Sequence, residues 1–563
     1  MTIVLYIIAI LIYEIGICNG EKMLKGQDIP YHFSLCRIIL YIIFMIGLII
    51  NIHKFVDNAI DTFQGKTKRV VILAYCIVAS MLMIYVAIRW TSMYQILSLF
   101  IAMLMGTIFL IYVSSDYIKN VIVITFTLGI VFTFSTDFHH TLDEKKHIMT
   151  SINIASGNLD YANKPLNNPL FNDIIFNCDM DSFAKMYGQK YEQNLTQEWN
   201  RTEETEIYYI CSIPAEYNFI LYLPSSIGIL YTKLLGGSIA DAYIIGRLFN
   251  LIVYSFMVVI MLKILPYKKK IFFAVYMLPL VLLLAGSFST DGIAFGLLGL
   301  FIAYCLKLSE KEDKEIGIKQ IVTLMILFIG CLLVKDFAYF AMIFLVLVLP
   351  IIKILKNNKK KIPILILLIL ISVSIVFFLA MNKLNKVTQI GGDIRGGDTG
   401  VTGQLNFLMQ SPKNIIEVGI SHVCNSILNY NWYTYLNHPD FFGKYASQMF
   451  FIEMIFIIYI AITDNSKKIK KRTIMVSSIT ALLVFATTSL MLYLTFTPIG
   501  QINITGYQPR YIIPLVPLVL MLINHKRYIG KTTEEEEKRI DTNISIVTGL
   551  IIMVNVMLLI HIV

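Results

Sequence analysis

Long apolar runs separated by short polar stretches follow one another along almost the whole chain. About 20 apolar residues, at 1.5 Å of rise per residue, cross a hydrocarbon core roughly 30 Å thick. Backbone groups inside lipid must be hydrogen-bonded within the protein, so runs of this length favour helices. The pattern predicts an all-α polytopic membrane protein with roughly fifteen spanning helices (about 13–17). The predicted spans are residues 2–19, 34–52, 70–88, 95–113, 120–137, 241–264, 271–288, 289–306, 318–335, 337–355, 362–381, 447–464, 474–496, 510–524 and 543–562.

The composition supports lipid as the solvent of most of the chain. Charged residues make up 15% of it and hydrophobic residues 57%, whereas soluble domains carry about 25% charged residues. The net charge is +10, and the basic residues gather in short clusters between apolar runs, as expected at the anionic inner face of a membrane. A soluble globular enzyme is therefore excluded, and nucleic acid is not an expected partner.

Clusters of Lys and Arg in short loops indicate which side of the membrane each loop occupies. These clusters alternate correctly if the N-terminus lies inside the cell and the C-terminus outside. Two long loops, residues 138–217 and 382–446, are then extracytoplasmic, and so is the short loop 497–509. Residues 218–237 would break the alternation if they crossed, so we expect an interfacial or re-entrant helix there.

The eight cysteines give no zinc spacing, because no two of them form a CxxC pair. Most lie in or beside apolar runs, where packing is the usual role of a thiol. Cys178 and Cys211 share the first long loop. A disulfide between them stays open, because spacing alone does not decide a pairing.

Ionisable residues inside the spans would indicate a transport pathway. Glu14 is nearly alone within a predicted span, and it lies near the outer end of its helix. The charged residues that adjoin the spans collect on the predicted outer side: Asp137, Asp143, Glu144, Arg247, Asp291, Lys335, Asp336 and Arg510. This distribution favours a site at the outer membrane surface over a transmembrane pathway.

A first cluster, HHTLDEKKH, begins at His139 and contains Asp143, Glu144 and His147. A carboxylate at a membrane interface can have a raised proton affinity and act as a general base. A solvated turn followed by the first turn of a helix is the competing interpretation, and the spacing alone favours it. Histidines and acids without zinc-type spacing do not indicate a metal site, and a divalent metal stays the less favoured alternative.

A second cluster occupies the predicted outer loop 497–509 and the start of the next span, and it ends in GYQPRY. Arg510 at headgroup level suits a phosphate, because its planar fork binds in a bidentate manner, and Gly506 permits close backbone approach. Snorkelling of an interfacial arginine explains Arg510 equally well. Lys335 and Asp291 lie at outer turns, where a cap or a salt bridge is the more frequent role.

Taken in order, these motifs resemble the bacterial membrane-protein family called domain of unknown function 2142. The resemblance rests on three short motifs and two supporting ones: Asp143-Glu144-x-x-His147; Lys335 with Tyr339; Gly506-x-Gln508-x-Arg510-Tyr511-x-x-Pro514-Leu515; Tyr222-x-Pro224 with Gly246-Arg247-x-x-Asn250; and Ser289-Thr290-Asp291. The chain departs from the family at Leu142 and Lys145, where prolines are expected, and at Pro509, where glycine is usual. The resemblance covers residues 120–525, which leaves an N-terminal four-helix extension at 1–119 and a cytoplasmic acidic loop with a final helix at 526–563.

That family is in turn similar to the C-type (GT-C) glycosyltransferase superfamily of membrane enzymes. The resemblance implies transfer of a sugar from a polyprenyl-phosphate donor to a cell-envelope glycan or protein, with inversion, outside a bacterial plasma membrane. Asp143 or Glu144 would be the catalytic acid residue, while Arg510 with Lys335 or Arg247 would bind the donor phosphate. His147, Asp291, Tyr339, Gln508 and Tyr511 would support them, and Trp432 and Tyr433 would pack on the acceptor.

Three other functions stay open at this point. A flippase or transporter of lipid-linked saccharides would move the lipid without making a bond. A glycan polymerase or ligase would use the same outer acids on a diphosphate-linked donor. A purely structural membrane protein is the remaining alternative. The residues do not identify the sugar or the acceptor, and they do not indicate a cofactor.

Overall fold

The computed structural model describes eleven stretches of the chain and a few single residues. The stretches are 69–75, 93–136, 143–159, 217–235, 239–311, 318–335, 338–349, 399–433, 446–464, 469–523 and 533–562, and the single residues are 77, 81, 141, 316, 370 and 374. The predicted spans 2–19 and 34–52 lie outside these residues, as does nearly all of 362–381. Cys178 and Cys211 lie outside them as well.

The secondary structure of the described residues is entirely helical, as the apolar pattern predicts. The helices are α4 (Met93–Tyr112), α5 (Tyr117–Ile124), the π-helix η1 (Thr125–Gly129), α6 (Ile130–Ser135), α7 (Glu144–Ala155), the 3-10 helix η2 (Phe219–Tyr222), α11 (Leu223–Leu234), α12 (Ile239–Ile264), α13 (Lys269–Tyr276), α14 (Pro279–Ala285), α15 (Asp291–Ser309), α16 (Ile318–Leu332), the 3-10 helix η4 (Phe340–Val348), α19 (Val401–Gln410), α20 (Pro412–Asn425), α21 (Tyr430–Tyr433), α23 (Ala446–Thr463), α24 (Lys471–Phe496), the 3-10 helix η6 (Pro509–Leu515), α25 (Val516–Leu520) and α26 (Glu534–Ile562).

Five helical segments within the described part of the chain are long and apolar enough to cross a membrane. They are Tyr117–Ser135, Asp241–Ile264, Asp291–Ser309, Lys471–Phe496 and Glu534–Leu559. Each coincides with a run predicted from the sequence, and the chain is therefore an all-helical membrane protein.

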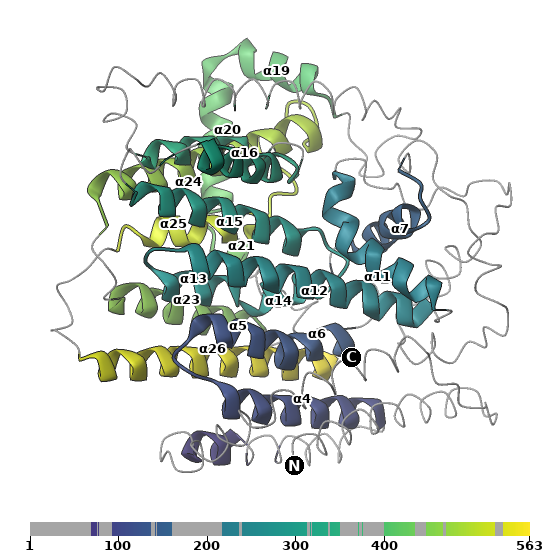
Figure 1. Ribbon diagram of the computed structural model, residues 1–563. Coiled ribbons are helices and arrows are strands. Elements are labelled where there is room, and N and C mark those ends of the chain that lie inside the picture. The colour runs from purple at the N-terminus through teal and green to yellow at the C-terminus, as the bar shows by residue number, and fades with distance from the viewer. Residues whose placement is uncertain are drawn as a thin grey trace, which may run out of the picture.

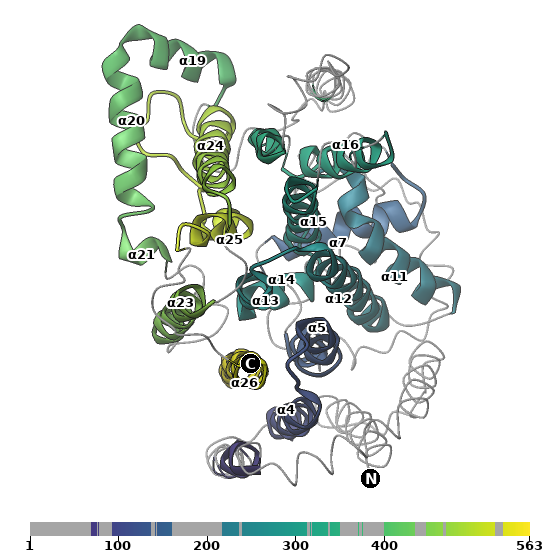
Figure 2. The same cartoon turned by 60° about the vertical axis from the view of Figure 1, so that its left-hand side comes forward.

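The long helices lie side by side with their axes roughly aligned (Figures 1 and 2). In Figure 2 most of them are seen nearly end-on, with α12 and α15 at the centre of the assembly. A single large apolar core joins them, built from buried residues of helices that include α5, α12, α15 and α26. Helix α20 runs across the direction of these long helices at the edge of the molecule.

The predicted span 271–288 is wrong as one continuous helix. The chain forms α13 and α14 instead, and it is extended at Leu278 between them. Pro279 causes the break, because proline has no amide hydrogen and disfavours helical backbone at the residue before it. The hydroxyl of Tyr254 donates to the carbonyl of Tyr276, which satisfies a backbone group that the break leaves without a helical partner.

The C-terminal helix α26 is packed into the bundle. Near its start, Asp541 accepts a hydrogen bond of 2.9 Å from the Tyr117 hydroxyl and pairs with Lys270 Nζ at 2.7 Å. One turn later, Ser545 Oγ accepts a 2.7 Å bond from Asn120 Nδ2. Helix α26 therefore makes polar contacts with α5 and α13, and it packs in the same apolar core as they do.

The expectation that Glu14 is nearly alone inside the spans is wrong. Glu453 lies within the predicted span 447–464, and the structure buries it in α23. Its Oε1 accepts a 3.1 Å hydrogen bond from Asn555 Nδ2 of α26. A buried carboxyl with an amide partner is one way in which a helix pair tolerates an ionisable side chain in lipid.

Helices α11 and α12 cross at two glycines. A Cβ added at Gly228 would lie 2.8 Å from the Ile245 carbonyl oxygen and 2.9 Å from the Gly246 Cα. Small residues at such a crossing let two backbones approach closely, as is usual between helices in membranes. The crossing matters for the rest of the molecule because α11 also packs against α7.

Replacing Gly228 with alanine tests this crossing. The Gly228→Ala side chain meets backbone atoms that cannot rotate away, so we expect a loss of about 1–3 kcal/mol of stability. The matched control is Gly419→Ala in α20, where an added Cβ meets nothing within 4 Å. Thermal unfolding of the purified protein in detergent measures both, and an equal change in the two variants would contradict the close crossing.

Candidate functional site

Five elements bring polar side chains together at one end of the bundle. These elements are the end of α6, helix α7, the first turns of α12 and α15, and the start of η6. Glu144 of α7 and Arg247 of α12 form the best-connected pair of this region. Both side chains are fully buried, with exposed fractions of 0%.

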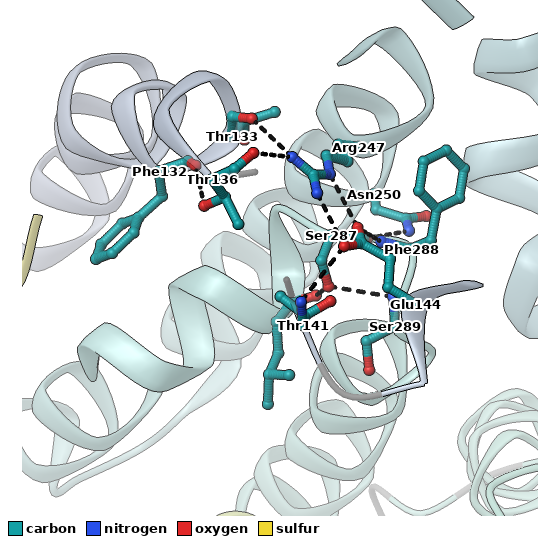
Figure 3. Close-up of polar contacts among 11 residues, drawn as sticks. Phe132, Thr133, Thr136, Thr141, Glu144, Arg247, Asn250, Ser287, Phe288 and Ser289 are labelled. Atoms are coloured by element: carbon teal, nitrogen blue, oxygen red, sulfur yellow. Dashed lines mark hydrogen bonds and ion pairs between the residues drawn. The ribbon is translucent and has the colours of Figure 1, made fainter. Parts of the chain in front are cut away.

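The Glu144 carboxylate is held on both of its oxygens, as Figure 3 shows. Arg247 Nε donates to Oε1 at 2.9 Å, and Nη2 donates to Oε2 at 2.8 Å. The backbone amide of Phe288, in the loop before α15, also donates to Oε1 at 3.1 Å. Hydrogen bonds of this bidentate, charge-assisted kind are among the strongest in proteins. Glu144 therefore has little remaining capacity to take a proton from a substrate.

The guanidinium of Arg247 has further partners that tie in α6 (Figure 3). Its Nη1 donates to the carbonyl oxygens of Thr136 at 2.7 Å and Thr133 at 3.3 Å, near the end of α6. The guanidinium carbon also lies 4.6 Å from the centre of the Tyr243 ring. The pair thus fastens α6, α7, α12 and the loop before α15 to one another.

Asp143 precedes Glu144 but occupies a different environment. Its side chain is 53% exposed, and its Oδ1 lies 3.9 Å from Lys146 Nζ. Its backbone is left-handed, with φ at 56°, a conformation that aspartate adopts more readily than most residues. The turn points the two adjacent carboxylates in different directions, so that Asp143 faces outward while Glu144 faces the bundle.

A second ionic centre joins α15, the segment after α16, and η6. Asp291, the first residue of α15, lies with Oδ1 3.1 Å from Lys335 Nζ and with Oδ2 3.1 Å from Arg510 Nε. The three side chains are mostly buried. Two cations share one carboxylate, which leaves this centre with an excess of one positive charge.

Several donors of this centre are buried without an acceptor in hydrogen-bond geometry among the described residues. They are Lys335 Nζ and the Nε and Nη1 atoms of Arg510. Lys335 Nζ and Arg510 Nε lie at ion-pair distance from Asp291. Arg510 Nη1 has no such contact. Burying a charged donor without an acceptor costs more than burying a neutral one. An anion with several oxygens would satisfy all three atoms.

Tyr511 is fixed between the two cation-bearing segments. Lys335 Nζ lies 3.4 Å from the centre of its ring, and the Tyr339 hydroxyl donates to its carbonyl oxygen at 2.8 Å. That carbonyl is available because Pro514, three residues on in the 3-10 helix η6, has no amide hydrogen to donate. Lys335 and Tyr339 therefore both hold Tyr511 in place, one through its ring and the other through its carbonyl oxygen.

His147 connects the acidic turn with the cation centre. Its Nδ1 is 2.9 Å from the Tyr222 hydroxyl, and its ring packs edge-on against Tyr217. Burial lowers the pKa of His147 to about 4, an effect that Arg510 and Lys335 reinforce and that Asp143 and Asp291 oppose. The imidazole is therefore neutral at pH 7, and three of the four charged groups that act on it belong to the Asp291 centre.

Trp432 and Tyr433 lie beside this centre in an aromatic cluster. Trp432 is 7% exposed, stacks on Tyr507 and donates from Nε1 to the Tyr507 carbonyl oxygen at 2.9 Å. The hydroxyl of Tyr433, which is half-buried, donates to the Ile427 carbonyl oxygen at 2.9 Å. The role of both residues in acceptor binding stays a prediction, since this conformation uses Trp432 for packing.

Gln508 contributes mainly through its backbone. Its carbonyl oxygen accepts a 3.1 Å bond from the Tyr511 amide at the start of η6. Within the described part of the chain, its partly exposed side chain makes no hydrogen bond. It is free to reach a ligand beside Arg510.

Two aromatic contacts of the site were not singled out from the sequence. Tyr217 packs on His147, and Tyr507 packs edge-on against Tyr511 with ring centres 5.6 Å apart. Tyr507 belongs to the GYQPRY motif, so its place beside Arg510 was a usable signal. Tyr217 lies near the start of an apolar run that shows no such pattern.

The described residues include no group of three His, Cys, Asp or Glu side chains arranged to hold a metal ion. His139, His140 and Asp336 lie outside the described residues. The chemistry available from the described side chains is therefore that of one outward carboxylate, one neutral imidazole and a partly neutralised pair of cations.

Comparison with known proteins identifies the family. The model of a family described as Predicted membrane protein (DUF2142) matches residues 126–519. That match covers more than half of the 563 residues, so the chain belongs to this family. Neither the curated proteins nor the solved structures contain a match. All the residues of both ionic centres lie within the matched segment.

The two neighbouring carboxylates should respond differently to loss of charge. The Glu144→Gln variant leaves Arg247 buried without its anion, and removing one partner of a buried pair costs about 3–5 kcal/mol. Asp143→Asn changes an exposed group and should cost less than about 0.5 kcal/mol. Thermal unfolding in detergent distinguishes the two, and similar losses in both variants would refute the assignment of Glu144 as the structural member.

Acid should weaken the fold partly through His147. Its pKa falls from 6.5 to about 4 on folding, so the unfolded chain binds the proton more readily and stability decreases as the pH falls between those values. The His147→Asn variant keeps a hydrogen-bonding group near Tyr222 but does not titrate. We expect the drop in melting temperature between pH 7 and pH 4.5 to be smaller in His147→Asn than in the wild type. An equal drop would show that His147 is not held neutral.

Proposed function

We propose that this member of the DUF2142 family is a membrane glycosyltransferase that takes a sugar from a polyprenyl-phosphate donor. The acceptor is a cell-envelope glycan or protein on the outer face of a bacterial plasma membrane, and the anomeric configuration is inverted. In this proposal the full chain has roughly fifteen spans in a GT-C-like arrangement. Its N-terminus lies inside the cell and its C-terminus outside.

The observation that carries the proposal is the excess positive charge around Asp291. Arg510 Nη1 is buried without an acceptor among the described residues, and Lys335 Nζ and Arg510 Nε share the single carboxylate of Asp291. The phosphodiester of the donor, and the phosphate monoester that leaves, both offer further oxygens. The centre lies where α15 begins, at an end of the bundle. A lipid phosphate would reach such a place with its head group while its polyprenyl chain stays in the bilayer.

Asp143 is the proposed general base. It is the member of the acidic pair with an exposed carboxylate, whereas both oxygens of Glu144 accept from Arg247 and Oε1 also accepts from the Phe288 amide. Through His147 it lies in the same electrostatic neighbourhood as Arg510 and Lys335. Acceptor and donor phosphate would therefore meet between α7 and η6.

The reaction is a single displacement at the anomeric carbon. The Asp143 carboxylate takes the proton of the acceptor hydroxyl, and the hydroxyl oxygen forms a bond to the anomeric carbon. The bond between that carbon and the phosphate oxygen breaks, and its electron pair passes to the leaving polyprenyl phosphate. Arg510 and Lys335 stabilise the negative charge that develops there, which is where fixed cations contribute most to catalysis.

The neighbouring residues have positioning roles in this scheme. Glu144 and Arg247 hold the turn that carries Asp143, so Arg247 acts on α7 and not on the donor phosphate. Tyr339 and Lys335 hold Tyr511, and thereby the backbone beside Arg510. His147, kept neutral by burial, separates the base from the cations without adding a charge of its own.

Sugar transfer in proteoliposomes tests the proposal. Radiolabelled polyprenyl-phosphate sugars serve as donors, and envelope fractions serve as acceptors. We expect Asp143→Asn and Arg510→Gln each to lower the transfer rate at least about a hundredfold, within the range of general-base and electrostatic contributions. Glu535→Gln, in the exposed first turn of α26 at the other end of the bundle, is the matched control and should leave the rate unchanged.

Two results would each replace this function with another. If no donor is consumed while labelled lipid still changes leaflet in the wild type and in Asp143→Asn, the protein is a flippase of lipid-linked saccharides. If transfer requires a diphosphate-linked oligosaccharide as donor, the protein is a polymerase or ligase. Both outcomes would contradict the monophosphate-linked donor proposed here.

A further inference from the structure

Helix α20 lies across the direction of the spanning helices. In Figure 2 the spans are seen nearly end-on while α20 is seen along its length, and Figure 1 shows it crossing them as well. His422 Nε2 of α20 is 2.7 Å from Ser489 Oγ, seven residues before α24 ends at Phe496. The helix therefore runs across the direction of the spans, and it contacts α24 within the last two turns of that helix.

The side of α20 that faces the protein is polar. Asn414 donates to the Phe407 carbonyl oxygen of α19 at 2.7 Å, and His422 pairs with Ser489. Ser421 and Asn425 both donate to Asn503 Oδ1 in the loop between α24 and η6. Side chains that a soluble protein would turn toward water are here turned toward the protein.

The opposite side of α20 is apolar and exposed. Ile416, Ile420 and Val423 of α20, and Ile427 two residues after its end, follow one another at intervals of four, three and four residues, the spacing of one helix face. Their exposed fractions are 59%, 61%, 38% and 39%. Leu428, just beyond them, is also exposed. An apolar stripe with its polar side inward is the reverse of the pattern on the surface of a soluble protein.

A charged edge borders this stripe. Lys413 and Glu417 pair across one turn, with Nζ and Oε1 3.3 Å apart, and their side chains are 77% and 40% exposed. The helix thus presents an apolar face, a charged edge and a protein-bound polar face. A helix that lies in a membrane interface requires the first two, because one side meets acyl chains while the next meets water.

We infer that α20 is an interfacial helix whose stripe of Ile416, Ile420, Val423 and Ile427 is inserted among the lipids of the leaflet on the same side as the Asp291 centre. The Lys413 and Glu417 edge faces the aqueous side. The lipid surface is the partner, since the helix runs across the direction of the spans and the stripe lies at the level of the ends of the spans. This assignment does not depend on the proposed transfer reaction.

Insertion of α20 bears on the site through a chain of ring contacts. The rings of His422 and Tyr507 pack at nearly right angles, with centres 4.8 Å apart, and Tyr507 packs against Tyr511 in the same way. Tyr511 in turn lies under Lys335. A helix anchored in the lipid surface therefore supports the loop and the aromatic residues beside Arg510.

Tryptophan fluorescence in vesicles of brominated phosphatidylcholine tests the inference. Ile420→Trp and Ile416→Trp place the probe in the stripe, and Lys413→Trp places it on the charged edge of the same helix. Leu482→Trp, exposed in the span α24, is the positive control for contact with lipid. The three native tryptophans give the same background in every variant.

We expect the bromolipid to quench both stripe probes at least twofold more strongly than Lys413→Trp, and aqueous iodide to quench them less. Stripe probes that iodide reaches as readily as Lys413→Trp would overturn the inference. Stripe probes protected from both quenchers would overturn it too, because they would indicate that a second protein surface, such as another copy of the chain, covers the stripe. Unchanged thermal unfolding shows that each variant is folded, and two stripe positions guard against failure of one.

Discussion

The buried pair of Glu144 and Arg247 determines the geometry on which the rest of the site depends. It joins α7 to α12, to the end of α6 and to the loop before α15. Two charges taken out of water are stable only when their geometry and remaining hydrogen bonds are nearly complete. Here Oε1 accepts from Arg247 and Phe288, and Oε2 accepts from Arg247 and, at 3.5 Å, from the Thr141 amide. The same pair places Asp143 on the outer side of the turn and His147 one turn further into α7. An acidic pair thus divides into one structural and one exposed carboxylate.

The second ionic centre differs from the first in being incomplete. Glu144 and Arg247 balance in charge, whereas Asp291 serves both Lys335 and Arg510. Burying such an excess is costly unless another interaction compensates for it, and the compensating anion that we propose is a phosphate head group at the membrane surface. The lipid also explains α20, whose polar side faces the protein and whose apolar side is exposed. The unbalanced charge at Asp291 and the exposed apolar side of α20 both suit the boundary of a membrane, where an apolar layer adjoins an aqueous one.

Much of this organisation could be predicted from the sequence. Apolar runs of spanning length gave the positions of α12, α15, α24 and α26, because period and length are local properties. The residues of the ionic centres could be named from motifs, but their roles could not. No spacing rule separates Asp143 from Glu144, since the difference arises from a left-handed turn and from an arginine about a hundred residues away.

Pro279 gave a local signal of the break in 271–288, but the length of the apolar run favoured one continuous helix. His422 gave no such local signal, because its partners come from α24 and from the loop before η6. Glu453 was overlooked in an apolar run, although its partner Asn555 could be found only in the folded chain.

The central claim is that Lys335 and Arg510 form a phosphate site for a lipid carrier, and direct binding tests it without any assumption about chemistry. The measurement is the affinity of the purified full chain for polyprenyl monophosphate, with the uncharged polyprenol as reference ligand, in the wild type and in Arg510→Gln. Hydrogen bonds to a charged group contribute about 1.5–3 kcal/mol, so the account predicts that the phosphate binds at least about tenfold more tightly than the alcohol. It also predicts that Arg510→Gln removes most of that preference. Equal binding of the two lipids, or a preference that persists in Arg510→Gln, would contradict the account.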